Sequence, residues 1–204
     1  LIENKLKSTP FEFTKTDYST DETLPNTTMK IYTINDELVY EGKTDENGKI
    51  EIKNLRTGNY KLKEISTNEW YNLAEDQNIE IKWDETTKTQ VENELKKGQI
   101  KVIKVDKENN EVKIPNVIFE VQDSTGNVLE QIKTDENGEA LTSKYPLRDY
   151  KSLRLHEIKT DEKYELSENI EEITLEENQI KTVQIENEKI KGNPNLTTYL
   201  LTES

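Results

Sequence analysis

Residues 11–17 read Phe-Glu-Phe-Thr-Lys-Thr-Asp and predict a β-strand with a lysine on its apolar face. Side chains of a strand alternate between its two faces, so Phe11, Phe13 and Lys15 point the same way. A lysine on a buried face costs free energy unless another group pairs with it or neutralises it. The strand therefore predicts a polar partner for Lys15 elsewhere in the chain.

The chain contains an internal repeat with a period near ninety residues. Both copies place a lysine in phase with apolar residues of a predicted strand and follow it with the same turn sequence. A placement that occurs twice is not an accident of composition. The matching segments are Lys15 with Lys104, Pro-Asn at 25–26 with 115–116, and Thr-Asp-Glu-Asn-Gly at 44–48 with 134–138.

The repeat predicts two tandem domains joined by a very short linker. The first seven residues resemble residues 91–97, which indicates that they end a preceding repeat. The nature of the C-terminal tail stays open. The predicted organisation is 1–7 as the end of a preceding repeat, 8–95 as domain 1, 96–98 as linker, 99–189 as domain 2 and 190–204 as tail.

Each repeat is predicted to be all-β, folded as an antiparallel β-sandwich. Short segments such as residues 60–64 alternate apolar and charged side chains, and Asp-Glu-Asn-Gly supplies turn residues between them. Such strands with one apolar face are typical of a sandwich. Residues 66–77 are irregular, and we expect Trp70, Tyr71 and Leu73 to be covered there.

The composition excludes several classes of function. The formal net charge of −14 argues against binding to nucleic acid or to an anionic membrane surface. The chain has no cysteine, which excludes disulfides, thiolate metal sites and a cysteine nucleophile. No motif for a cofactor, a phosphate or a metal ion is present, and we expect none to bind.

Two further polar residues in each repeat fall on the apolar face. Glu64 is in phase with Tyr60 and Leu62, and its counterpart Glu157 is in phase with the leucines before it. Near the end of each repeat an asparagine, Asn93 or Asn187, follows an apolar strand in the same phase. Each domain therefore directs one lysine, one carboxyl group and one carboxamide inward.

The residues alone leave two interpretations open. One is a buried ion pair capped by an amide, which satisfies the hydrogen-bonding groups without a reaction. The other is covalent. A desolvated lysine can be a neutral nucleophile, and a neighbouring carboxyl group can donate a proton to the amide oxygen and shuttle protons. Attack on the asparagine side chain would then release ammonia and leave a Lys–Asn isopeptide bond.

The ordered set Lys-x-Asp, Thr-Asp-x-x-Gly, Tyr-x-Leu-x-Glu and a late strand ending in Asn resembles the CnaB-type, SpaA-like domain of Gram-positive surface adhesins and pilins. That resemblance covers almost the whole chain twice, and it implies that each antiparallel β-sandwich is of the prealbumin-like, immunoglobulin-like kind. It implies a spontaneous isopeptide bond in each domain, catalysed by the acidic residue. The implied sites are Lys15–Asn93 with Glu64, Lys104–Asn187 with Glu157, and Asn4 as the bonded asparagine of a preceding domain.

The resemblance implies a structural stalk segment of a cell-wall-anchored surface protein rather than an enzyme, because the reaction is a single intramolecular turnover. The implied partners are neighbouring repeats of the same chain, with a host matrix protein bound through other domains as a further possibility. We expect an extracellular, cell-wall location, with the signal peptide and the sorting signal outside this fragment. A ligand-binding adhesin region and a subunit of a sortase-assembled pilus remain alternative functions.

Overall fold

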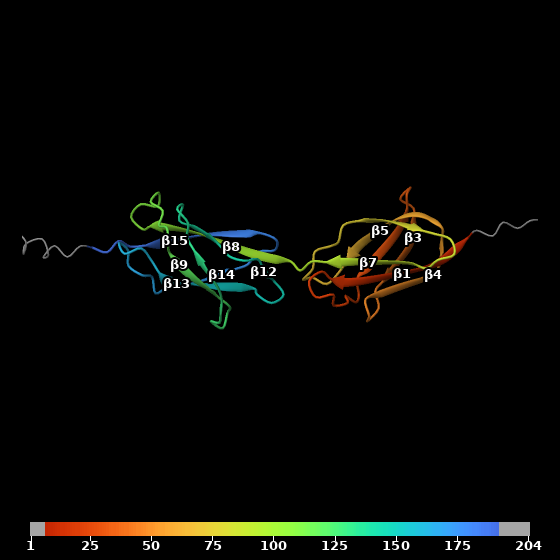
Figure 1. The fold of residues 1–204 in the computed structure, drawn as a ribbon, viewed down its shortest axis with the longest axis horizontal. Coiled ribbons are helices and arrows are strands. Elements are labelled where there is room, and N and C mark those ends of the chain that lie inside the picture. The colour runs from red at the N-terminus through yellow and green to blue at the C-terminus, as the bar shows by residue number, and fades with distance from the viewer. Residues whose placement is uncertain (1–6, 192–204) are drawn as a thin grey trace, which may run out of the picture. The chain divides into compact units, whose positions relative to one another are not determined.

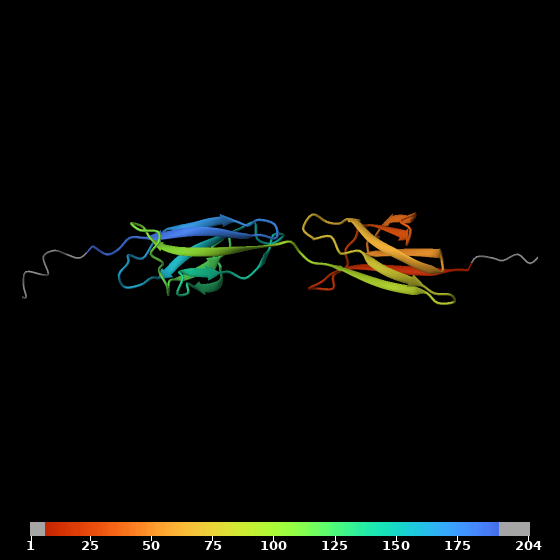
Figure 2. The same ribbon diagram turned by 90° about the horizontal axis from the view of Figure 1, so that it is seen from above.

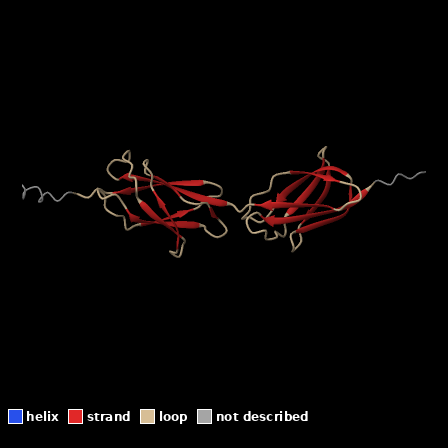
Figure 3. Cartoon of the chain, in the orientation of Figure 1, coloured by secondary structure: helices blue, strands red, loops and turns tan. Residues whose placement is uncertain are grey.

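The computed structural model describes residues 7–191, which form only strands, turns and loops (Figure 3). Within them no helix is long and apolar enough to cross a membrane. The chain divides into two compact units between Lys96 and Lys97. The strands (Figure 1) are β1 (Ser8–Asp17), β2 (Thr28–Thr33), β3 (Leu38–Lys43), β4 (Lys49–Arg56), β5 (Gly58–Ser66), β6 (Gln77–Ile81), β7 (Thr87–Asn93), β8 (Lys97–Asp106), β9 (Ile118–Gln122), β10 (Val128–Lys133), β11 (Glu139–Leu141), β12 (Tyr145–Pro146), β13 (Ser152–Lys159), β14 (Ile170–Thr174) and β15 (Ile180–Asn187).

The two units repeat the same pair of sheets, which confirms the prediction of two all-β domains. In the first unit the sheets have the orders β4-β1-β7 and β3-β2-β5-β6. In the second unit, the sheet β10-β9-β13-β14 corresponds to the sheet β3-β2-β5-β6 of the first. In the other sheet of the second unit, β8 lies between β11 and β15 and also pairs briefly with β12. Strand β8 begins at Lys97, inside the segment predicted as a linker.

The first and last strands of each domain run parallel, within a sandwich that is otherwise antiparallel as predicted. β1 pairs with β7 in parallel along residues 11–17, and β8 pairs with β15 in the same way. The neighbouring green and blue strands β8 and β15 are visible side by side in Figure 2. The other strand pairs are antiparallel. The alternation of side chains is the same in both kinds of pairing, so it does not reveal strand direction.

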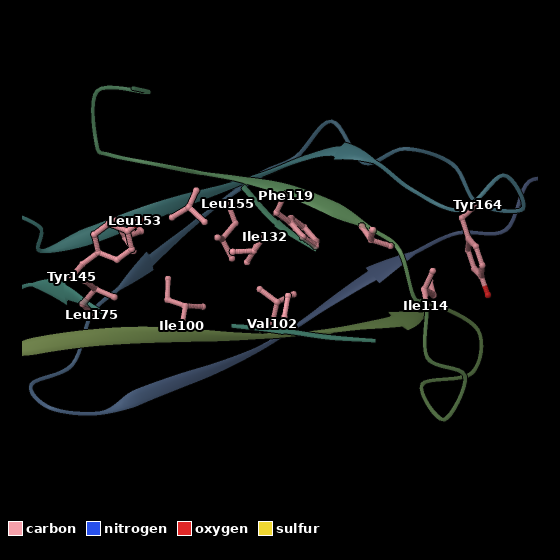
Figure 4. Packing of buried hydrophobic residues seen from close by; sticks show 13 residues of the cluster. Ile100, Val102, Ile114, Phe119, Ile132, Tyr145, Leu153, Leu155, Tyr164 and Leu175 are labelled. Carbon is pink, nitrogen blue, oxygen red and sulfur yellow. The ribbon is translucent and has the colours of Figure 1, made fainter. Parts of the chain in front are cut away.

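The core of each domain lies between its two sheets. In the second domain, Ile100 and Val102 of β8 face Phe119 of β9 and Leu155 of β13 (Figure 4), and all four are almost fully buried. In the first domain Phe11 and Phe13 of β1 take the equivalent place, with 1% of each side chain exposed. The predicted phase of the first strand is therefore correct, and Lys15 follows the phenylalanines into the interior.

The irregular segment between β5 and β6 is only partly covered. Tyr71 is buried, as expected, and Trp70 is half-buried. The prediction for Leu73 is wrong, because 55% of its side chain is exposed. Without a regular period, this loop gives no phase from which to infer which side chains point inward.

The Asp-Glu-Asn-Gly turns fix the backbone of the buried lysines. The amide of Lys104 donates to the carbonyl of Gly138 at 2.7 Å, and the Ile114 amide donates to the Lys104 carbonyl at 3.0 Å. Gly138 has a φ of +68°, and a Cβ there would lie 2.6 Å from the Lys104 carbonyl oxygen. Gly48 meets Lys15 in the same manner. The turn therefore requires glycine both for its conformation and for close approach to the lysine.

Replacing Gly138 with alanine should destabilise domain 2 by about 3 kcal/mol, because a positive φ is combined with a backbone clash. Gly126→Ala is the matched control. Its φ is +93°, but a Cβ there would meet only the end of the Arg154 side chain, at 3.3 Å. We expect about 1 kcal/mol for the control. Hydrogen exchange of the β8 amides during a urea titration measures the stability of domain 2 in both variants. Equal losses of stability in the two variants would contradict a positioning contact between Gly138 and Lys104.

Candidate functional site

Lys15 and Lys104 lie on the first strands of their domains, and 0% of each residue is exposed. Burial lowers the pKa of both ammonium groups, and the charges of Glu64 and Glu157 only partly offset this effect. Desolvation disfavours the charged form of an amine. Each lysine therefore reaches the neutral, nucleophilic form more easily than a lysine on the surface.

In domain 1 the three predicted side chains contact one another. Lys15 Nζ lies 3.1 Å from Glu64 Oε2 and donates a hydrogen bond to Asn93 Oδ1. Asn93 Nδ2 in turn donates to Glu64 Oε1 at 2.7 Å. The amide of Ala74, in the loop after β5, donates to Glu64 Oε2 at 3.0 Å. The lysine, the carboxyl group and the carboxamide thus form a closed, buried triangle.

Domain 2 repeats the triangle with the equivalent three residues. Lys104 Nζ lies 2.7 Å from Glu157 Oε2 and donates to Asn187 Oδ1 at 2.6 Å. Asn187 Nδ2 donates to Glu157 Oε1 at 2.6 Å and also to Thr160 Oγ1 at 2.9 Å. The carbonyl of Glu186 accepts a further hydrogen bond from Lys104 Nζ at 3.3 Å. Two separate copies of the sequence therefore bring the same three groups together.

The parallel strand pair is what brings lysine and asparagine together. Asn93 stands opposite Asp17 in the register, two residues beyond Lys15, and therefore on the same face. Asn187 stands opposite Asp106 in the same relation to Lys104. The long lysine side chain reaches along this face to the carboxamide, and the glutamate reaches both from the facing sheet.

The carboxyl group contacts the amide nitrogen, whereas the sequence-based prediction placed it at the amide oxygen. Glu64 touches Lys15 through Oε2 and Asn93 Nδ2 through Oε1. It thus bridges the lysine nitrogen and the amide nitrogen of the asparagine. A carboxyl group in this position can accept a proton from one and deliver it to the other.

The aspartate of each Lys-x-Asp sequence holds the loop that covers the site, a contact the sequence did not reveal. Asp17 is buried and accepts a hydrogen bond from the Tyr71 hydroxyl at 2.9 Å. Asp106 accepts one from Tyr164 at 2.9 Å and also pairs with Lys189, 2.7 Å away. The aspartate is in phase with the lysine two residues earlier, so its burial could have been inferred from period two. Its tyrosine partner lies in an irregular loop and could not.

Two other residues lie away from these triangles. Asn4, proposed as the bonded asparagine of a preceding domain, lies outside the described residues. His156, the one histidine of the chain, is half-buried on the strand face opposite Glu157, with its Nδ1 3.8 Å from Glu120. In residues 7–191, no cluster of three or more histidine or acidic side chains is arranged to hold a metal ion.

A family model described as the SpaA prealbumin-like fold domain matches residues 9–95 and again residues 98–189. The chain therefore belongs to the SpaA prealbumin-like fold family, with two tandem copies of the domain. This agrees with the resemblance seen in the ordered sequence motifs. Among curated proteins no sequence matches this chain.

Solved structures with the same fold include the Bacillus anthracis TIE protein. The similarity to it has a TM-score of 0.65 and 29% identity, and covers 90% of this chain and 35% of that one. The chain thus spans about a third of that structure. GBS52, the minor pilin of Streptococcus agalactiae, is matched at a TM-score of 0.42 and 16% identity, over 91% of this chain and 98% of that one.

Removing the tyrosine hydroxyl should destabilise domain 1 more than domain 2. Burial alone would raise the pKa of Asp17, but hydrogen bonds from Tyr71, Ser19 and Thr20 together hold it below its ordinary value. The hydrogen bonds to the Asp17 carboxylate therefore stabilise the folded domain at pH values above the pKa of Asp17 in the unfolded chain. This stabilisation is lost as the pH falls through the lower pKa of Asp17 in the folded domain. We expect Tyr71→Phe to cost about 1–2 kcal/mol at neutral pH and less in acid, once Asp17 is protonated.

Tyr164→Phe is the matched control, because Asp106 keeps its contact with Lys189. Urea unfolding of the full chain at the two pH values measures both variants. A loss for Tyr71→Phe that does not depend on pH would show that its hydroxyl does not act through Asp17.

Proposed function

We propose that the chain is a stalk segment of a Gram-positive surface protein, in which each domain forms its own Lys–Asn isopeptide bond. The bonds are Lys15–Asn93 and Lys104–Asn187, with Glu64 and Glu157 as the proton-transferring groups. The observation that carries this proposal is the closed lysine–glutamate–asparagine triangle, present in both domains. A buried ion pair alone would not require a carboxamide in contact with both the amine and the carboxyl group in both copies.

The reaction balances within the triangle. The lysine ammonium passes a proton to the glutamate, giving a neutral amine and a carboxylic acid. The amine nitrogen attacks the asparagine Cγ, and the bond from Cγ to Nδ2 breaks as Nδ2 takes up a proton through the carboxyl group. The products are a secondary amide, ammonia and a protonated glutamate. The lowered pKa of Lys15 and Lys104 favours the first step, and contact distances favour the second.

The parallel pairing suits a segment under tension. The chain enters domain 1 at the start of β1 and leaves it at the end of β7, which run in the same direction. A bond from Lys15 to Asn93 would carry force directly between these strands. The chain between the two residues, which are 78 positions apart, would then carry no tension. The same would hold in domain 2 for Lys104 and Asn187, which are 83 positions apart.

The bond would also stabilise the domain without load. Closing a loop of this length in the unfolded chain is worth about 4.5 kcal/mol in the chain-entropy model used for disulfides. Because the chain has no cysteine, disulfides cannot stabilise it. An amide cross-link, which forms without an oxidant, would take that role in a protein at the cell surface. The reaction happens once per domain, so the protein is a self-processing structural element and not an enzyme.

The intact mass of the purified protein should be lower than the sequence mass by two molecules of ammonia, one for each domain. Glu64→Gln should restore one ammonia and leave the bond in domain 2, because glutamine cannot shuttle the proton. Glu157→Gln is its mirror image and should leave only the bond in domain 1. Peptide mapping would locate each cross-link. A wild-type mass equal to that of the plain sequence would refute the covalent proposal.

Stretching single molecules should separate the wild-type chain from the Glu64→Gln variant. Without its bond, domain 1 should unfold and lengthen by roughly 250 Å, the extended length of its chain less its folded length. The wild-type domain should show no such step before the tether detaches. Glu157→Gln serves as the control and should show one step of similar length from domain 2. A wild-type step of full domain length would contradict the force path through Lys15 and Asn93.

A further inference from the structure

The two domains differ at one polar contact beside the reacting groups. Thr67 and Thr160 occupy equivalent positions, each three residues after the glutamate of its domain. Thr160 Oγ1 accepts a hydrogen bond from Asn187 Nδ2 at 2.9 Å. Thr67 instead pairs its hydroxyl with that of Thr27, 3.1 Å away. The same residue type in the same place therefore has a different partner in each domain.

The residue facing this threonine accounts for the difference. The repeat aligns Thr27 with Val117, and both follow a Pro-Asn pair. The two residues have equivalent backbone positions, because the amide of each donates a hydrogen bond to a buried threonine hydroxyl at 2.9 Å. Both residues are 0% exposed. Val117 offers no hydroxyl, so the only hydrogen bond that Thr160 Oγ1 makes among the described residues is to Asn187. In domain 1 the hydroxyl of Thr67 is instead hydrogen-bonded to the hydroxyl of Thr27.

We propose that Thr160 is a further catalytic residue of domain 2, which holds the leaving nitrogen of Asn187 and stabilises it as ammonia departs. This proposal rests on the isopeptide bond proposed above. In the starting state the two hydrogens of Asn187 Nδ2 are directed to Glu157 Oε1 and Thr160 Oγ1. The carboxamide is thereby fixed with its oxygen toward Lys104 Nζ.

The contact gains strength where the reaction needs it. When Nδ2 takes up a proton through Glu157, it gains positive charge, and a hydroxyl oxygen is a good acceptor for a charged N–H donor. Thr160 neither gains nor loses a proton overall, so the balance of the reaction is unchanged.

The test follows cross-linking in the full chain as it is made. Cell-free synthesis is quenched in acidic denaturant at intervals, and digestion with mass spectrometry gives the cross-linked fraction of each domain separately. The pH is set low enough that the wild type cross-links more slowly than it folds. Thr160→Val, of nearly the same shape, should slow domain 2 about tenfold, the effect of one hydrogen bond to a group gaining charge. Domain 1 of the same molecule is the internal control.

Three further variants separate catalysis from packing. Thr160→Ser keeps the hydroxyl and should restore the rate of domain 2. Thr67→Val should leave the rate of domain 1 unchanged, because the Thr67 hydroxyl is turned toward Thr27. Val117→Thr should offer Thr160 a competing hydroxyl, draw it away from Asn187 and slow cross-linking in domain 2. In a chain that already carries Thr160→Val, adding Val117→Thr should not slow cross-linking further.

The reciprocal change gives a gain of function. Thr27→Val should free Thr67 for Asn93 and speed domain 1, and this gain should vanish in the Thr27→Val, Thr67→Val double variant. An unchanged rate for Thr160→Val in a chain that does cross-link would overturn the role of Thr160 alone. A wild-type chain without any cross-link would overturn the proposed bond and, with it, this inference.

Discussion

Each domain is organised around a lysine ammonium group held in the interior beside one carboxyl group and one carboxamide. Such a group is tolerated only while its partners stay in place, since breaking a buried ion pair by removing one partner costs about 3–5 kcal/mol. The triangle of Lys15, Glu64 and Asn93 draws its members from both sheets. The polar site therefore ties the two layers of the sandwich together at one point of the core.

Three separate pieces of backbone keep that triangle in position. The Asn-Gly turn bonds to the lysine's own peptide unit, and the parallel last strand places the asparagine one same-face position beyond it. The loop after β5 supplies the Ala74 amide to the glutamate and the Tyr71 hydroxyl to Asp17. These supports are far apart in sequence, so the lysine, carboxyl and carboxamide groups meet only once the domain has folded.

Period-two alternation predicted the contents of the site because it reports which side of a strand is buried. It placed Lys15, Glu64 and Asn93 in the interior from sequence alone, and the repeat supplied their counterparts. It could not give the direction of β7 relative to β1, which leaves the alternation unchanged. It also failed for Leu73, in a loop without a period. The partner of Thr160 depends on whether residue 117 carries a hydroxyl, and no local pattern contains that information.

The parallel pairing of first and last strands has a consequence for how such a protein lengthens. An antiparallel pair would return the chain to the end of the domain where it entered, and another copy would need a long return connection. A domain that receives the chain at one end and releases it at the other can be followed directly by a further copy. Here only residues 94–96 separate β7 from β8. Duplication of the coding segment can therefore add a complete domain without redesigning its neighbours.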